Sequence, residues 1–267
     1  MLNKKSDHFD LWHQSEEFFN IAEVCCDRWA KEKNKIAIIE KDSSGGSVCY
    51  TFLDLQQQAN RLANSLQKKG ISVGDRVGIM LPQSLESAVA HMAIYKLGAV
   101  AVPLFKLFGV DAIEHRVRNS RMSSLITDTQ SLTKLSGLLE ASAPLDSCYV
   151  TDLLDSKGKL LSYKKELANN SDQFDNYPTK IKDPALIIYT SGTTGHPKGA
   201  LHAQRVLLGH LPGVQISHDQ FPQPGDRMWT PADWAWIGGL LDVLLPSLYF
   251  GVPVVAYRAE KFSAEDI

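Results

Sequence analysis

Apolar and polar residues alternate in blocks along this chain, with short apolar runs separated by longer stretches of helical spacing. The short apolar runs predict buried strands, at residues 36–40, 48–51, 76–81, 99–102, 124–127, 148–150, 185–189 and 252–256. Helical spacing fills most of the intervals, at residues 16–33, 52–66, 84–97, 111–119, 132–139, 163–168, 200–210 and 237–250. Strands that alternate with helices predict an α/β fold with layered, mostly parallel sheets flanked by helices.

Boundary residues support several of these elements. Thr51 followed by Asp54 has the form of a capping box, in which each side chain bonds the other residue's backbone. Gly70 is placed to end the helix that follows, and Ser84 is placed to cap the next one. Residues 155–182 are polar and lack strong periodicity, so we expect a surface segment with one helix at 163–168.

Directly after the apolar run at 185–189 comes a loop of small hydroxyl and glycine residues, followed by a lysine. Glycines allow the backbone to approach an anion, hydroxyl groups donate hydrogen bonds, and lysine supplies a movable positive charge. The pattern predicts a phosphate-binding loop that leads into a helix at 200–210. The residues of this loop are Thr190, Ser191, Gly192, Thr193, Thr194, Gly195 and Lys198.

The loop is not of the common NTPase type. In that type, lysine directly follows the last glycine and Ser or Thr directly follows lysine, whereas here Lys198 lies between Pro197 and Gly199. A P-loop phosphotransferase is therefore disfavoured. The glycine pattern that opens a dinucleotide-binding helix is missing as well.

The pattern T-S-G-T-T-G-x-P-K-G, which begins at Thr190, resembles the signature loop of the adenylate-forming superfamily. That superfamily includes acyl-CoA synthetases, the adenylation domains of peptide synthetases, and luciferases. Residues 51–55, 95–104 and 228–238 resemble three further family segments, so the resemblance runs from about residue 18 to the last residue. The aromatic form of residues 233–236 is most similar to acetyl- and medium-chain acyl-CoA synthetases.

The resemblance implies a reaction in two steps. A carboxylate attacks the α-phosphate of ATP to give an acyl-adenylate and pyrophosphate, and the thiol of coenzyme A then displaces AMP. Because an anionic nucleophile meets a polyanion, phosphate oxygens must be neutralised, which Mg2+ and a mobile lysine can do. By resemblance the loop holds the β- and γ-phosphates, and Lys198 is the catalytic residue that follows the departing pyrophosphate.

A second set of residues is implied to line the acyl pocket: Asp233, Trp234, Trp236 and Gly238. Aromatic rings can form the wall of a pocket and set its depth. Trp side chains also fill hydrophobic cores, and both interpretations stay open. We expect His202 to be structural and His196, in the variable position of the loop motif, to face solvent.

Composition excludes some classes of function. The chain has 267 residues, is 44% hydrophobic and 22% charged, and carries a net charge of −2, which gives no reason to expect a nucleic-acid partner. The cysteines show neither zinc-site nor disulfide spacing, and unpaired thiols suit a reducing compartment such as the cytoplasm. No membrane span is expected at 235–257, because Asp242 and several prolines and glycines interrupt the apolar residues.

Complete members of the superfamily continue well beyond the part that this chain resembles, and there they carry a Mg2+ ligand, a ribose-binding Asp and a second catalytic Lys. We therefore expect residues 1–267 to be part of the large N-terminal AMP-binding domain, without a metal ligand and inactive alone. An adenylation enzyme that loads a carrier protein, or a noncatalytic nucleotide-binding remnant, remains an alternative. The acid substrate and the oligomeric state stay open.

Overall fold

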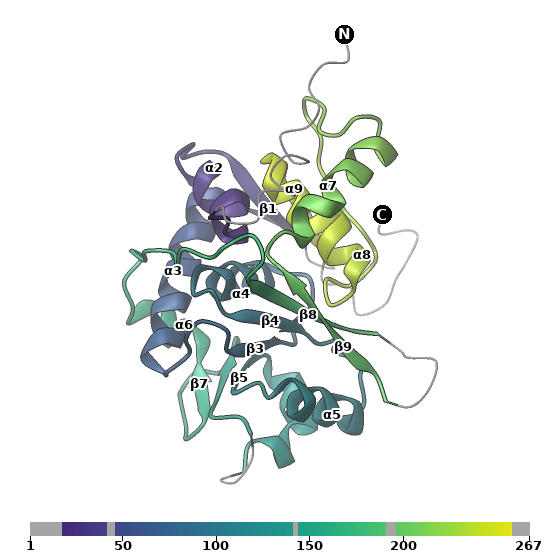
Figure 1. The fold of residues 1–267 in the computed structure, drawn as a ribbon. Helices are drawn as coiled ribbons and strands as arrows, with labels where there is room; N and C mark the ends of the chain where they lie inside the picture. The colour runs from purple at the N-terminus through teal and green to yellow at the C-terminus, as the bar shows by residue number, and fades with distance from the viewer. Residues whose placement is uncertain (1–17, 42–45, 141–143, 191–195, 258–267) are drawn as a thin grey trace.

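The computed structural model describes residues 18–41, 46–140, 144–190 and 196–257. They form two sheets with helices around them (Figure 1). The larger sheet has the strand order β7-β6-β5-β3-β4-β8-β9, and the smaller one has the order β10-β1-β2. In the larger sheet every neighbouring pair is parallel except β8 and β9. The predicted α/β class with mostly parallel sheets is confirmed.

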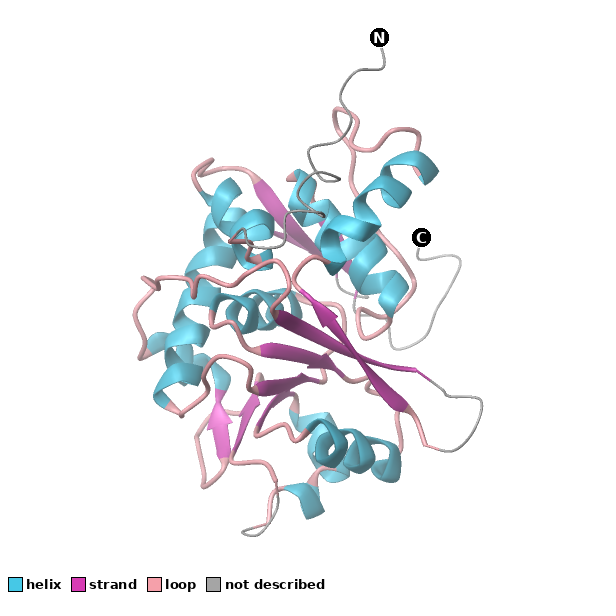
Figure 2. Cartoon of the chain, in the orientation of Figure 1, coloured by secondary structure: helices cyan, strands magenta, loops and turns pink. Residues whose placement is uncertain are grey.

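The strands of the larger sheet are β3 (Arg76–Ile79), β4 (Val100–Pro103), β5 (Ser124–Thr127), β6 (Ser147–Val150), β7 (Leu160–Ser162), β8 (Pro184–Thr190) and β9 (Lys198–Ala203). Those of the smaller sheet are β1 (Ile36–Lys41), β2 (Ser47–Thr51) and β10 (Val254–Tyr257). Figure 2 shows β8 and β9 as the two long strands of one hairpin at the edge of the larger sheet.

The α-helices are α2 (Arg28–Ala30), α3 (Phe52–Lys68), α4 (Leu85–Lys96), α5 (Val110–Ser120), α6 (Tyr163–Ala168), α7 (Val206–Ser217), α8 (Ile237–Gly239) and α9 (Leu245–Phe250). Two π-helices are η1 (Glu23–Asp27) and η4 (Leu240–Leu244), and two 3-10 helices are η2 (Thr129–Lys134) and η3 (Ser136–Leu138). The helix expected at 132–139 is therefore two short 3-10 turns. The last strand begins two residues later than expected.

Both faces of the larger sheet are covered, and the strand residues alternate between two hydrophobic cores. Val77 and Ile126 belong to the core on the α3 and α4 side, whereas Met80 and Leu125 belong to the core on the α5 side. Figure 1 shows α4 and α5 on opposite sides of the sheet. Burial on both faces explains why these strands are short apolar runs rather than alternating ones.

A buried ion pair ties the N-terminal helical turns to α4. Lys96, which is 1% exposed, donates to both carboxylate oxygens of Asp27 at 2.5 and 2.6 Å. Gln56 and Asn176 donate to the same carboxylate, each at 2.7 Å. Because every partner of the pair is satisfied, its desolvation is offset, and removing one member would leave a buried charge alone.

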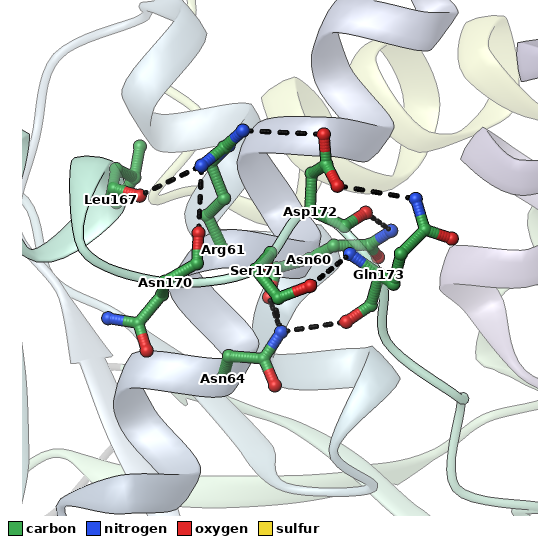
Figure 3. A network of polar contacts seen from close by, with 8 residues as sticks. All are labelled: Asn60, Arg61, Asn64, Leu167, Asn170, Ser171, Asp172 and Gln173. Carbon is green, nitrogen blue, oxygen red and sulfur yellow. Dashed lines mark hydrogen bonds and ion pairs between the residues drawn. The ribbon is translucent and has the colours of Figure 1, made fainter.

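A second polar network holds the segment after α6 against α3 (Figure 3). Arg61 donates to the carbonyl oxygen of Asn170 at 2.7 Å and to the carboxylate of Asp172 at 3.3 Å. Asn64 donates to the carbonyl oxygens of Ser171 and Gln173, both at 2.9 Å. The surface segment expected from its polar composition is thus tied to α3 by side-chain bonds to backbone carbonyls, and its apolar residues Phe174 and Ile181 also pack against the hydrophobic core.

The capping box at the start of α3 yields a stability prediction. Thr51 Oγ1 accepts from the Asp54 backbone N–H at 3.1 Å, and Asp54 Oδ2 accepts from the Thr51 N–H at 2.8 Å. Thr51→Ala should lower the free energy of unfolding by about 1 kcal/mol. Urea denaturation measures this, and Thr51→Ser, which keeps the hydroxyl, is the control. Equal loss in both variants would contradict a capping role.

Candidate active site

The carboxyl ends of the parallel strands β3 to β8 share one edge of the sheet, where open α/β folds bind their ligands. Several side chains lie at the ends of these strands or within four residues of them: Gln83 after β3, Phe105 and Lys106 after β4, Asp128 after β5, and Thr190 at the end of β8. The fold therefore brings residues that are distant in sequence to the same edge.

The predicted phosphate loop connects β8 to β9. Thr190 is the last residue of β8, Lys198 is the first residue of β9, and the two are direct partners in the antiparallel ladder. Both are exposed. Ser191, Gly192, Thr193, Thr194 and Gly195 lie outside the described residues, so their predicted contacts with phosphate stay predictions.

The helix expected at 200–210 is wrong. Residues Lys198–Ala203 form β9, and the helix α7 begins only at Val206. The reason is nonlocal, because β9 pairs with β8 along its whole length and this pairing overrides the local pattern. Lys198 thus begins a strand, and the expected helix N-terminus beside the loop is not formed there.

A histidine on α5 holds the second half of the hairpin loop. His115 Nε2 lies 2.9 Å from the carbonyl oxygen of Pro197, a contact in which the ring N–H is the donor. The His196 ring stacks on the His115 ring, with centroids 4.9 Å apart and planes at 21°. His196 is exposed as expected, but it is also packed. These contacts fix the chain just before Lys198.

The base of the hairpin is fixed from the other strand. Tyr189 donates through its hydroxyl to Asn119 Oδ1 at 2.7 Å and packs its ring against His115. Gly199 is the partner of Tyr189 in the ladder between β8 and β9. A Cβ added to Gly199 would lie 2.8 Å from Ile187 Cγ2 and 3.1 Å from Tyr189 Cζ. Glycine at this position therefore allows the Tyr189 ring to cross over β9.

An aromatic cluster lies between the chain after β4 and the segment before α8. The Trp236 ring centroid is 5.4 Å from that of Phe105 and 5.8 Å from that of Phe108. Trp236 is 40% exposed, so one face of its ring can contact a ligand. The segment is held in place by Gln83, whose Nε2 donates to the carbonyl oxygens of Thr230 at 2.9 Å and Ala232 at 2.8 Å.

The other candidates for the acyl pocket differ in exposure. Trp234 is 2% exposed and belongs to the main hydrophobic core, which supports a packing role for it. Burial raises the pKa of Asp233, while the Ala235 backbone N–H, 2.7 Å from its carboxylate, and the nearby Lys106 charge lower it. An added Cβ at Gly239 would lie 2.4 Å from the Asp233 carbonyl oxygen, so glycine allows α8 to pack directly against this turn.

Lys106 and Asp128 form an ion pair at this edge that the sequence interpretation missed. Lys106 Nζ lies 2.5 Å from Asp128 Oδ2, and Lys106 also donates to Gln130 Oε1 at 3.1 Å. Lys106 follows the end of β4 and Asp128 follows the end of β5. These positions could have indicated the ion pair, but only once the order of the strands in the sheet is known.

His202, expected to be structural, is partly buried on β9, and burial together with the charge of His210 lowers its pKa.

The remaining features of the described residues contribute little to the candidate site. They contain no group of three His, Cys, Asp or Glu side chains that could hold a metal. None of their helices is both long and apolar enough to span a bilayer, and the apolar stretch around 237–250 is three short consecutive helices. An open groove of about 500 Å3 between α3 and residues 172–175 is lined by none of the predicted site residues.

Comparisons with known proteins show the family of the chain. Residues 26–267 match the AMP-binding enzyme family, and the chain belongs to that family. It is 31% identical over 255 residues to an acetyl-coenzyme A synthetase of Alkalilimnicola ehrlichii, a match that covers 87% of this chain and 39% of the relative. An acetyl-coenzyme A synthetase of Xanthobacter autotrophicus is 31% identical over 259 residues, covering 88% and 39%. The chain thus spans about two-fifths of the length of these curated relatives.

Two solved structures share the fold. An acyl-CoA synthetase of Brucella canis superposes with a TM-score of 0.86 at 24% identity, over 98% of this chain and 48% of the other. The anthranilate CoA ligase AuaEII, solved in complex with anthranoyl-AMP, gives a TM-score of 0.82 at 22% identity, over 95% and 47%. Both likenesses confirm the arrangement of strands and helices described above.

The His115 contact predicts how firmly the hairpin is closed. His115→Phe keeps a ring against Tyr189 but loses the hydrogen bond to Pro197, which is worth about 1 kcal/mol. Backbone amides of residues 198–200 should then exchange with solvent about fivefold faster. Glu114→Gln, on the same helix in an exposed ion pair with Arg118, is the control. Unchanged exchange in His115→Phe would remove this residue from the hairpin's support.

The raised pKa of Asp233 predicts a pH dependence. Folding favours the protonated carboxyl, so this contribution to stability is present below the ordinary value of 3.8 and is lost as pH rises through the raised pKa. Asp233→Asn, a neutral mimic, should be more stable than the wild type at neutral pH, with the difference shrinking in acid. Urea denaturation across this pH range tests it, with exposed Asp146→Asn as control. A difference that grows in acid would contradict the sign.

Proposed function

We propose that this chain carries the nucleotide-phosphate site and part of the acid site of an AMP-forming acyl-CoA synthetase. In the proposed reaction a carboxylic acid is activated by ATP to an acyl-adenylate and then transferred to coenzyme A. Residues 1–267 would form part of the enzyme's large domain. The observation that carries the proposal is the hairpin from Thr190 to Lys198, which joins β8 to β9 at the carboxyl edge of the sheet.

The geometry supports separate roles for the two sides of this edge. Lys198 is exposed beside Thr190, where its charge can follow the oxygens of a polyphosphate as pyrophosphate leaves. The exposed face of Trp236, backed by Phe105 and Phe108, provides an apolar wall for the acid. Asp233, Trp234 and Gly238, the other residues predicted to line the acyl pocket, would belong to the same site, and Trp234 is buried in the main core.

Other participants follow from the family rather than from side chains of this chain. Coenzyme A as the thiol is supported by the names of the relatives and solved structures, which favour it over a carrier protein. Mg2+ would enter with the nucleotide, and we assign it no ligand among the described residues. The unpaired Cys25, Cys26, Cys49 and Cys148 support a cytoplasmic location, and a role in fatty acid metabolism fits the activity.

Lys198→Ala tests the phosphate role directly. A charged hydrogen bond to phosphate is worth about 1.5–3 kcal/mol, so the chain's affinity for ATP and for pyrophosphate should fall at least about tenfold. Affinity for AMP, which lacks the β- and γ-phosphates, should not change. Isothermal titration calorimetry measures all three, and the free energy of unfolding should stay within about 0.5 kcal/mol because the residue is exposed.

Lys182→Ala, an exposed lysine just before β8, is the matched control and should leave every affinity unchanged. Equal ATP affinity in Lys198→Ala and the wild type would reject the assigned role of Lys198. Failure of the wild-type chain to bind ATP, pyrophosphate or AMP would reject the proposed function as a whole.

A further inference from the structure

Beyond the aromatic wall, two polar side chains pair across a helix contact. His210 on α7 and Asp242 on η4 meet through His210 Nδ1 and Asp242 Oδ1 at 2.7 Å. Their side chains are 27% and 48% exposed. A pair this accessible contributes little to stability, so holding α7 against η4 is a weak reason for its presence.

The pair borders the space above Gly238. A Cβ added at Gly238 would find Asp242 Oδ2 as its only neighbour within 4 Å, at 3.8 Å. Asp242 lies in a π-helical turn, a feature that occurs frequently at functional sites. A ligand that passes Trp236 and reaches over Gly238 would therefore meet the carboxylate.

The hydrogen-bonding capacity of the pair defines what it can bind. A carboxylate accepts only, so His210 Nδ1 carries the proton of their shared bond and holds Asp242 Oδ1, which leaves Asp242 Oδ2 as an acceptor. Among the described residues, no hydrogen bond reaches Asp242 Oδ2 or His210 Nε2. Asp242 Oδ2 is thus an open acceptor, and a plain alkyl tail over it would leave it without a partner once water is excluded.

We propose that Asp242 and His210 select carboxylic acids whose tail carries a hydrogen-bond donor, a hydroxyl or an ammonium group, over acids with a plain alkyl tail. The inference rests on the proposed function, because the acid site is placed beside Gly238 by that function. It makes the acid site two-sided, with an aromatic wall for the chain and a polar end for its terminal group. Asp242 and His210 are its specificity-determining residues.

The test uses the full chain and stable mimics of the acyl-adenylate, N-acylsulfamoyl adenosines, in pairs of matched chain length. One member of each pair ends in a methyl group, and the other ends in a hydroxyl or an ammonium group. Titration calorimetry should show a preference of about tenfold or more for the donor-bearing mimic at one chain length. Equal or weaker binding of the donor-bearing mimic at every length overturns the inference.

Variants separate a selective role from a structural one. Asp242→Asn is nearly isosteric, removes the negative charge and turns one of the two acceptor oxygens into a donor, and His210→Phe keeps a ring on α7. Asp242→Asn should abolish the preference for the ammonium-bearing mimic, and His210→Phe should weaken it because the carboxylate loses the bond that orients it. The affinity for the alkyl mimic should stay within about twofold in both variants, since that tail makes no bond to either group. His218→Phe, at the end of the same helix, should retain the preference. A preference for the ammonium-bearing mimic that survives unchanged in Asp242→Asn overturns the assignment.

The same titrations distinguish a failure of this inference from a failure of the proposed function. If both members of a pair bind with equal affinity, the adenylate site stands and the selectivity is rejected. If no mimic, ATP or AMP binds to the chain, the proposed function fails and the inference fails with it.

Discussion

The antiparallel register between β8 and β9 is the constraint on which the candidate site depends. It places Lys198 directly opposite Thr190 and returns the chain to the sheet edge after the loop. The register favours glycine at position 199, because an added Cβ would lie 2.8 Å from Ile187 Cγ2 and 3.1 Å from Tyr189 Cζ. Tyr189 is in turn bonded to Asn119 on α5. The position of an exposed lysine is thus determined by buried contacts below it.

The parallel order of β3, β4, β5 and β8 supplies the remaining side chains. In such a sheet the residue after each strand arrives at the same edge, although the intervening helices separate them along the chain. The Gln83 amide shows how firmly this edge is assembled, since it donates to two backbone carbonyls of the segment that carries Trp236. The aromatic wall is therefore attached to the chain after β3 as well as to the chain after β4.

Much of the fold could be predicted from the sequence, because strands buried on both faces leave apolar runs and because caps such as Thr51 and Ser84 have local signatures. What could not be predicted depends on contacts between distant residues. The strand at 198–203 is stabilised by pairing with β8, and its own sequence gives no period-two pattern. The strand order brings Lys106 to Asp128, and helix packing brings His210 to Asp242. Neither arrangement can be predicted from the spacing of residues along the chain.

The two ends of the candidate acid site illustrate how differently apolar and polar groups define a ligand. In the proposed acid site the rings of Trp236, Phe105 and Phe108 would accept any apolar chain of suitable width, because burial of area is nondirectional. Acceptor atoms at a pocket end discriminate more sharply, because a mismatched ligand leaves them desolvated and unpaired. Asp242 and His210 are held by α7 and η4, two elements packed against each other, so their orientation is set before a ligand arrives. Orientation fixed in advance lowers the entropic cost of recognition, and in the proposed acid site a small polar pair would therefore outweigh a large aromatic wall in choosing among acids of similar size.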